Sequence, residues 1–306
     1  MPPILSKPSK PAFPVSRRTS LIGIGAAMSA WLSGCSGTAA LDKLVARDTY
    51  LGRTGLAYGP DARHRIDVYR PLGLPPAGGL PVVLFFYGGN WTRGERADYR
   101  FVGEALAANG ILALVADYRL SPAVAYEGML QDCALALQWT LRNAADHGGD
   151  PTRVMVMGHS AGAYNAAMLA LDPRWLASLG LAPSRLAGWI GLAGPYDFLP
   201  IGDPEVKVAF RWPDTPADSQ PVAHAATRAP RTLLVAGTAD RTVDAERNTN
   251  GLARRLRAAG TEVQVRLIPG LGHVRTVAAM ARSLDWAAPV LPVVLAFVRG
   301  EALPDA

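Results

Sequence analysis

The stretch Val154-Met155-Val156-Met157-Gly158-His159-Ser160-Ala161-Gly162-Ala163 decides the fold of this chain. Its apolar first half predicts a buried strand, and the small residues after Ser160 predict a helix. The Gly-x-Ser-x-Gly pattern between them is typical of a sharp turn that strains the backbone of the serine. A side chain at Gly158 or Gly162 would collide with the neighbouring strand and helix. Ser160 would then stand alone above the sheet as a nucleophile. The alternative is an ordinary glycine-rich turn.

Apolar strands alternate with helices on both sides of this turn. The expected strands are 82–86, 111–116, 154–157, 189–192, 232–236 and 263–268, and the expected helices are 101–108, 128–145, 163–171, 245–259 and 290–298. Continuous apolar strands are typical of a parallel sheet that helices cover on both faces. The chain is therefore predicted to be an α/β protein with a doubly wound, mostly parallel sheet.

Two further strands are expected upstream, near residues 53–58 and 65–69. In the second, Ile66 and Val68 alternate with Arg65 and Asp67, which predicts an exposed antiparallel edge. Residues 198–230 are the least regular part of the chain, and we expect them to lie over the sheet as a partial lid or as a plain surface loop. They contain six prolines, at positions 200, 204, 213, 216, 221 and 230.

A serine hydroxyl becomes a nucleophile only beside a base that a third group orients. Of the five histidines, only His273 lies on a glycine-flanked loop after an apolar strand; the alternative is a histidine that faces water. Asp240 follows the strand 232–236 and is the favoured acid. Its rival, Asp244, is expected to cap the helix that begins at Ala245. The order Ser160, Asp240, His273 is that of α/β-hydrolases.

Acyl transfer also needs donors for the oxygen of the tetrahedral intermediate. One is expected to be the backbone N–H of Ala161, and the others are expected from Tyr87-Gly88-Gly89-Asn90-Trp91, directly after the strand 82–86. Glycines let a loop turn its amides toward a bound oxygen without side chains in the way.

This loop resembles the H-G-G-x-W loop of the esterase/lipase branch of α/β-hydrolases, a group that includes carboxylesterases, feruloyl-esterase-like enzymes and kynurenine formamidases. Other stretches that match in order are 117–122, 131–139, 148–151 and 194–197, so the resemblance covers about residues 51–299. It implies the α/β-hydrolase fold, with Ser160 as nucleophile, His273 as base and Asp240 as its orienter. It also implies that Gly88, Gly89 and Ala161 form the oxyanion hole.

Tyr87 departs from this pattern, because the family has a histidine there. We expect Tyr87 to brace the loop; the alternative is a hydroxyl that donates directly to the oxyanion. Asn90 replaces the third glycine of the lipase-like version of the loop. Trp91 is expected to pack, or to border the acyl pocket. The acids Asp117, Asp132 and Asp197, together with Arg119, are expected to be structural.

The N-terminus is predicted to be an export signal. Arg17 and Arg18 precede an apolar run, 21–32, that is too short to span a bilayer, and Leu32-Ser33-Gly34-Cys35 resembles a bacterial lipobox. The arginine pair resembles a twin-arginine signal; the alternatives to cleavage are a retained anchor and a start codon chosen too early. The prediction is a signal over 1–35, lipidation at Cys35, a tether over 36–50 and a hydrolase domain over 51–302. The protein would then be anchored in the bacterial cell envelope or periplasm.

Composition limits the partners. The formal charge is +6, but the first 34 residues hold four of the 31 basic residues and none of the 25 acidic ones, which leaves +2 for the rest. Nothing therefore points to nucleic acid. The sequence shows no metal-ligand spacing and no phosphate-loop lysine, so neither a metal nor another cofactor is expected. Cys133, the second cysteine, is expected to be buried packing.

These observations predict a carboxylesterase-type serine hydrolase that acts on a small, uncharged ester. The alternatives are an arylformamidase-like amidase, which would act on the same scaffold, and a binding protein that has lost turnover. The sequence leaves the acyl chain, the alcohol, the physiological substrate and the oligomeric state open.

Overall fold

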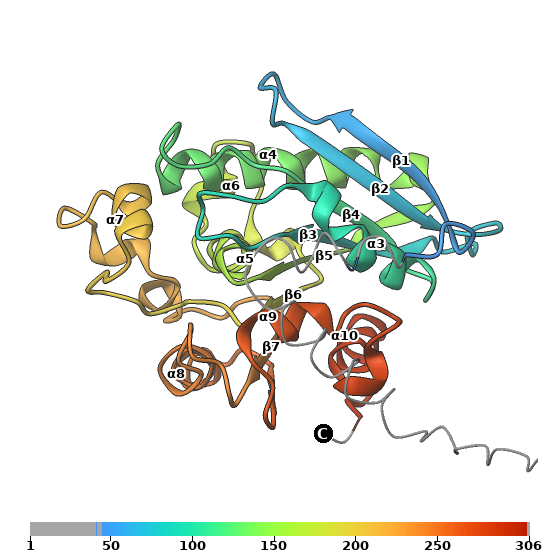
Figure 1. Cartoon of the computed structure of the whole chain (residues 1–306). Helices are drawn as coiled ribbons and strands as arrows, with labels where there is room; N and C mark the ends of the chain where they lie inside the picture. The colour runs from blue at the N-terminus through green and yellow to red at the C-terminus, as the bar shows by residue number, and fades with distance from the viewer. Residues whose placement is uncertain (1–40, 42–44, 305–306) are drawn as a thin grey trace, which may run out of the picture.

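The computed structural model describes residue 41 and residues 45–304, and these form one eight-stranded sheet with helices packed around it (Figure 1). The strand order is β1-β2-β4-β3-β5-β6-β7-β8. The strands are β1 (Tyr50–Ala57), β2 (Arg65–Pro71), β3 (Leu80–Phe86), β4 (Leu112–Ala116), β5 (Gly149–His159), β6 (Gly188–Leu192), β7 (Thr232–Gly237) and β8 (Val263–Ile268). Strands β3 to β8 pair in parallel, so the predicted α/β class and doubly wound, mostly parallel sheet are confirmed.

The first two strands form the antiparallel end of the sheet, as predicted, but the predicted exposure of residues 65–69 is wrong. Strand β1 is the exposed edge, and β2 lies between β1 and β4 with residues 66–69 buried. The alternation misled because the polar member, Asp67, is buried with its charge paired. Its Oδ1 accepts hydrogen bonds from Arg96 Nε and from the N–H of Gly55, both at 2.7 Å.

The helices pack on the sheet through small and apolar side chains. They are α3 (Arg100–Ala107), α4 (Tyr126–Asn143), α5 (Ala161–Leu171), α6 (Arg174–Ala177), α7 (Pro204–Phe210), α8 (Gly251–Ala258), α9 (His273–Ala278) and α10 (Val290–Arg299). Figure 1 shows α4, α5 and α6 grouped on one side of the sheet and α10 on the other. All residues of α5 are buried, because this helix continues the elbow into the middle of the molecule.

Short helical turns complete the connections. They are η1 (Arg96–Tyr99), η2 (Ala145–His147), η3 (Pro183–Arg185), η4 (Ala217–Ser219), η5 (Pro221–His224), η7 (Asp285–Ala287) and the π-helical turn η6 (Glu246–Asn250). The helix predicted over 245–259 is thus divided into η6 and α8. Helices α6, α7 and α9 were not predicted, because four to seven residues are too few to show a helical period.

The core is densest around the central strands. Val82 to Phe86 of β3 are fully buried, and burial of each large apolar side chain contributes about 1.5–3 kcal/mol to stability. Cys133 is buried in the same core, as predicted, and burial raises the pKa of its thiol. Within residues 45–304, no helix has the length and apolar character needed to cross a bilayer. The signal predicted over 1–35 and its Cys35 lie outside the described residues, and the predicted domain boundary at residue 51 stays a prediction.

Candidate active site

Ser160 lies at the turn between β5 and α5, at the carboxyl end of the parallel strands. Its φ of 53° and ψ of −122° are the strained conformation that the motif predicts, at a cost of about 1–3 kcal/mol. The two glycines explain how the turn fits. A Cβ at Gly158 would lie 2.1 Å from the carbonyl oxygen of Gly162, and a Cβ at Gly162 would lie 2.0 Å from that of Phe86. Backbone atoms therefore leave no room for a side chain at either glycine.

The structure brings the three predicted catalytic side chains into one chain of hydrogen bonds. His273 Nε2 lies 2.8 Å from Ser160 Oγ, and His273 Nδ1 lies 2.8 Å from Asp240 Oδ2. His273 is the first residue of α9, so its predicted placement on a loop is wrong. The difference is small in space, because Gly272 ends the loop and the imidazole still projects over the ends of the strands.

Asp240 is held by more than the histidine. Its Oδ1 accepts the N–H groups of Thr242, at 2.8 Å, and of Val243, at 2.9 Å. Burial alone would raise the pKa of this carboxyl, but His273 and the two backbone donors hold the pKa below its ordinary value. Asp244 does not join the chain: its side chain accepts the N–H of Arg247 at 2.7 Å, which is the capping role predicted for it.

The loop after β3 lies directly against the elbow. A Cβ at Gly88 would approach Ser160 Cβ to 2.9 Å, and a Cβ at Gly89, whose φ is 130°, would meet the carbonyl oxygen of Arg93 at 2.3 Å. Ala161 occupies the first position of α5, where a backbone N–H has no partner within the helix. Of the predicted oxyanion residues, Gly88 and Ala161 thus lie next to the nucleophile, and Gly89 follows Gly88 in the same loop.

The hydroxyl of Tyr87 lies in a buried polar network. Its hydroxyl donates to Asp117 Oδ1 at 3.0 Å and accepts from Arg63 at 2.6 Å, and its ring stacks between Tyr99 and Tyr118. Burial raises the pKa of this phenol, so it stays protonated and keeps its donor. These contacts favour the bracing role over direct donation to the oxyanion.

Asn90 and Trp91, which follow Gly89 in the loop, both have positive φ, at 52° and 59°. Trp91 is buried, its Nε1 donates to Asn165 Oδ1 at 3.2 Å, and its ring lies edge-on against Tyr164 and Phe210. Of the two roles left open for Trp91, the contacts show packing. Asn90 is half-buried.

Residues 198–230 pack over this loop. Helix α7 begins at a cap, where Asp203 accepts the N–H of Glu205, and Figure 1 shows the segment at the far end of the molecule from β1. Phe198 and Phe210 pack on Trp91, and Glu205 pairs with Arg93 at 2.6 Å. The segment therefore covers the loop and is held to it by these contacts. Neither of the two predicted forms, a partial lid or a plain surface loop, describes this arrangement in full.

The polar residues predicted to be structural do pair with other charges. Asp117 binds Arg96, Asp132 binds Arg119 at 2.6 Å, and Asp197 binds Arg247 at 2.9 Å. Sequence reasoning missed Arg63, Arg96 and His159 as partners around the site. Only His159 carried a signal, because it stands inside the elbow motif; the others reach the site from distant segments.

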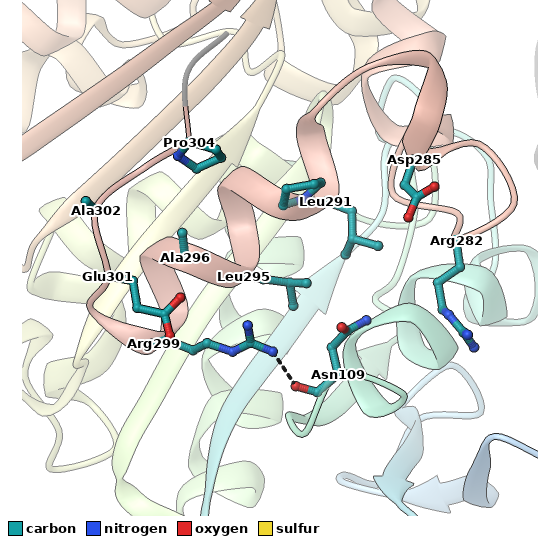
Figure 2. A pocket seen from close by; sticks show the side chains of 11 residues that line it. Asn109, Arg282, Asp285, Leu291, Leu295, Ala296, Arg299, Glu301, Ala302 and Pro304 are labelled. Atoms are coloured by element: carbon teal, nitrogen blue, oxygen red, sulfur yellow. Dashed lines mark hydrogen bonds between the residues drawn. The ribbon is translucent and has the colours of Figure 1, made fainter.

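A hollow of about 490 Å³ elsewhere on the molecule contains none of these residues. It lies beside α10, where Leu291, Leu295 and Arg299 face Asn109, and Arg299 donates to the backbone oxygen of Asn109 at 2.9 Å (Figure 2).

Comparison with known proteins shows the family of this chain. The BD-FAE family profile matches residues 66–256. Esterase LipC of Mycobacterium tuberculosis is 30% identical over 245 residues, which cover 73% of this chain and 60% of that protein. The probable isoprenylcysteine alpha-carbonyl methylesterase ICMEL1 of Arabidopsis thaliana is 27% identical over 243 residues, which cover 72% of this chain and 50% of that protein. This chain thus spans half to three-fifths of the length of these relatives.

Solved structures share the fold. A truncated carbohydrate esterase from gut microbiota superposes with a TM-score of 0.67 at 18% identity, over 84% of this chain and 98% of that one. Esterase 2 of Thermogutta terrifontis superposes with a TM-score of 0.66 at 23% identity, over 85% of this chain and 98% of that one. With the profile match over most of the sheet, these likenesses confirm the resemblance seen in the motifs: the chain belongs to the BD-FAE family, in the esterase branch of the α/β-hydrolases.

Proposed function

We propose that this protein hydrolyses carboxylic esters through an acyl-enzyme on Ser160. One observation carries the proposal. Asp240, His273 and Ser160 form an unbroken chain of two hydrogen bonds, each 2.8 Å long, and Gly88 of the loop after β3 lies against Ser160. The names of the relatives, which are esterases and a probable methylesterase, support the same reaction class.

The geometry supports a two-step reaction. Ser160 Oγ attacks the ester carbonyl carbon while His273 Nε2 takes the hydroxyl proton, and Asp240 stabilises the imidazolium that forms. The N–H groups of Ala161, Gly88 and Gly89 bind the oxyanion; each such donor is worth roughly 2.7–4 kcal/mol in the transition state. His273 then returns the proton to the leaving alcohol. In the second step His273 takes a proton from water, whose oxygen attacks the acyl carbon. The bond from that carbon to Ser160 Oγ then breaks, His273 gives the proton to Oγ, and the acid leaves.

The charges near the site support an uncharged substrate. Arg93 is paired with Glu205, and Arg247 is paired with Asp197, so both guanidinium groups are already neutralised. The aromatic packing of Trp91 with Phe198 and Phe210 supports a small acyl group, since this cluster fills the space beside the loop.

A panel of p-nitrophenyl esters from acetyl to decanoyl, with an N-formylanilide beside it, tests the proposal. We expect the highest kcat/KM on the short acyl esters, little turnover of the anilide, and loss of turnover in Ser160→Ala. Turnover of the anilide above all esters would favour the amidase, and no turnover of any compound would favour a binding protein.

We also propose that the protein is exported and anchored to a membrane through lipid on Cys35. The lipobox-like sequence before Cys35 and the basic and apolar segments upstream support this. When the full chain is expressed in bacteria with a labelled fatty acid, we expect label on the wild type, recovery in the membrane fraction, and neither for Cys35→Ser. A Cys35→Ser variant that still sediments with membranes would contradict the proposal.

A further inference from the structure

His159 stands directly before the nucleophile, at the end of β5, and the two-step reaction above gives it no role. Its side chain is buried, and the residue is only 4% exposed. It separates two parts of the site that come from distant segments. Gly88, in the loop after β3, lies against one edge of its ring, and His273, at the start of α9, lies against the other.

The contact with His273 determines where the proton of His159 sits. His159 Nε2 lies 3.1 Å from the backbone carbonyl oxygen of His273. A carbonyl oxygen can only accept a hydrogen bond, so Nε2 must be the protonated nitrogen. The two imidazole rings are also in contact, with centroids 5.0 Å apart. His159 therefore holds the main chain of His273 and limits where its ring can move.

The opposite edge of the ring faces the oxyanion loop. A Cβ at Gly88 would lie 3.1 Å from His159 Nδ1, and this buried nitrogen has no hydrogen-bond partner among the described residues. Burial first, and the neighbouring His273 second, lower the pKa of His159 to about 3. His159 thus stays neutral while His273 gains and loses its proton, and it places no second positive charge beside the imidazolium.

We propose that His159 is a positioning residue: its Nε2–H fixes the backbone of His273, and its ring sets the separation between that base and the oxyanion donors at Gly88. This inference rests on the proposed esterase function, because the separation matters only if both groups act on one carbonyl. A spacer of this kind acts in the transition state, where base and donors must be in place together.

Two substitutions separate the hydrogen bond from the space that the ring fills. In His159→Gln the amide Nε2 is the same number of bonds from Cα as the histidine Nε2, so the donor to His273 is retained. In His159→Met the volume is kept and the donor is lost. Thermal unfolding of both variants, beside the wild type, identifies any variant that fails to fold.

Steady-state kinetics on a p-nitrophenyl ester gives the first readout. We expect kcat of His159→Met to fall by about 10- to 100-fold with KM within about twofold, since a shift of about 1 Å in a catalytic group costs up to about 100-fold. His159→Gln should recover most of that loss. Wild-type kcat in a folded His159→Met, or an equal loss in both variants, would overturn the inference.

A second readout does not depend on turnover. The proton between His273 Nδ1 and Asp240 should give a downfield NMR signal, because a charge-assisted hydrogen bond deshields it. We expect the signal in the wild type and in His159→Gln, and a shifted or broadened signal in His159→Met. An unchanged signal in folded His159→Met would overturn the inference, whether or not the wild type hydrolyses esters. A wild type that hydrolyses no ester would, by itself, overturn only the proposed function.

Discussion

Replacement of Asp240 by asparagine should stop catalysis for a reason that can be worked out from the hydrogen bonds of the carboxylate. Oδ1 accepts two backbone N–H groups, from Thr242 and Val243, while Oδ2 faces His273 Nδ1. The amide introduced by Asp240→Asn must keep its oxygen toward the two backbone donors. Its NH₂ group then points at His273 Nδ1, which has to become an acceptor. The only imidazole proton moves to Nε2, where it faces Ser160 and leaves no base.

The size of the effect follows from the cost of restoring the reactive tautomer. Turning the amide around gives up two partly exposed backbone hydrogen bonds, at about 1 kcal/mol each. The transition state also loses the bond from the carboxylate to the imidazolium, which is worth about 1.5–3 kcal/mol. The total of about 3.5–5 kcal/mol corresponds to a fall in kcat of roughly 1,000-fold, at 1.36 kcal/mol for each factor of ten.

Asp244→Asn is the matched control, because Asp244 caps a helical turn next to the same loop and an asparagine can cap it as well. Hydrolysis of p-nitrophenyl acetate, followed for both variants at the same pH, provides the comparison. We expect Asp244→Asn to stay within about threefold of the wild type. Equal losses in the two variants, or a loss of less than about tenfold in Asp240→Asn, would refute the assignment of the acid.

Three further predictions concern the supports of the site. Gly162→Ala should lower the thermal midpoint by roughly 6–12 °C, because its Cβ would overlap the Phe86 carbonyl at a cost of about 3 kcal/mol. Gly78→Ala, whose Cβ would lie in open space, should not lower it. Equal midpoints in the two variants would refute the packing argument. Tyr87→Phe should lose about 1–2 kcal/mol of stability in urea unfolding and keep kcat within about threefold; a stable but inactive variant would show that the hydroxyl donates to the oxyanion. The third concerns acid. Since the pKa of His159 falls to about 3 on folding, only the unfolded chain binds that proton between about pH 6.5 and pH 3, so stability falls as the pH falls through this window. In His159→Gln the free energy of unfolding should depend less steeply on pH in this window, by up to about 1.36 kcal/mol per pH unit. If the urea midpoints of the wild type and the variant changed in parallel with pH, the prediction would be contradicted.

The sheet and the three aligned side chains could be predicted because each depends on a local constraint. The elbow needs two glycines at fixed spacing, and both meet backbone within about 2 Å if a Cβ is added. The central strands β3, β4, β6 and β7 are buried along nearly their whole length and therefore read as continuous apolar runs. Asp240 follows β7 and His273 follows β8, so the order of the strands placed both side chains at the same edge of the sheet as Ser160.

The other features of the fold and the site depend on contacts between residues far apart in the sequence, which the spacing of motifs does not show. Asp67 reads as an exposed strand residue, and its burial is tolerable because its carboxylate accepts hydrogen bonds from Arg96, 29 positions away, and from the N–H of Gly55. Tyr87 departs from the family pattern, and its role became clear only from Arg63 and Asp117, which reach its hydroxyl from other segments. His159 was one of five histidines in the sequence, and its contact with His273 spans 114 positions.

The most direct test of the central claim is covalent labelling of Ser160. A fluorophosphonate probe reacts only with a serine that a base activates, so it reports the triad without any assumption about the natural ester. We expect stoichiometric labelling of the purified protein, located by mass spectrometry on the peptide that contains Ser160, strongly slowed labelling of Asp240→Asn, and none of Ser160→Ala. A folded wild type that takes up no label, or one that is labelled equally well after Ser160→Ala, would contradict the account.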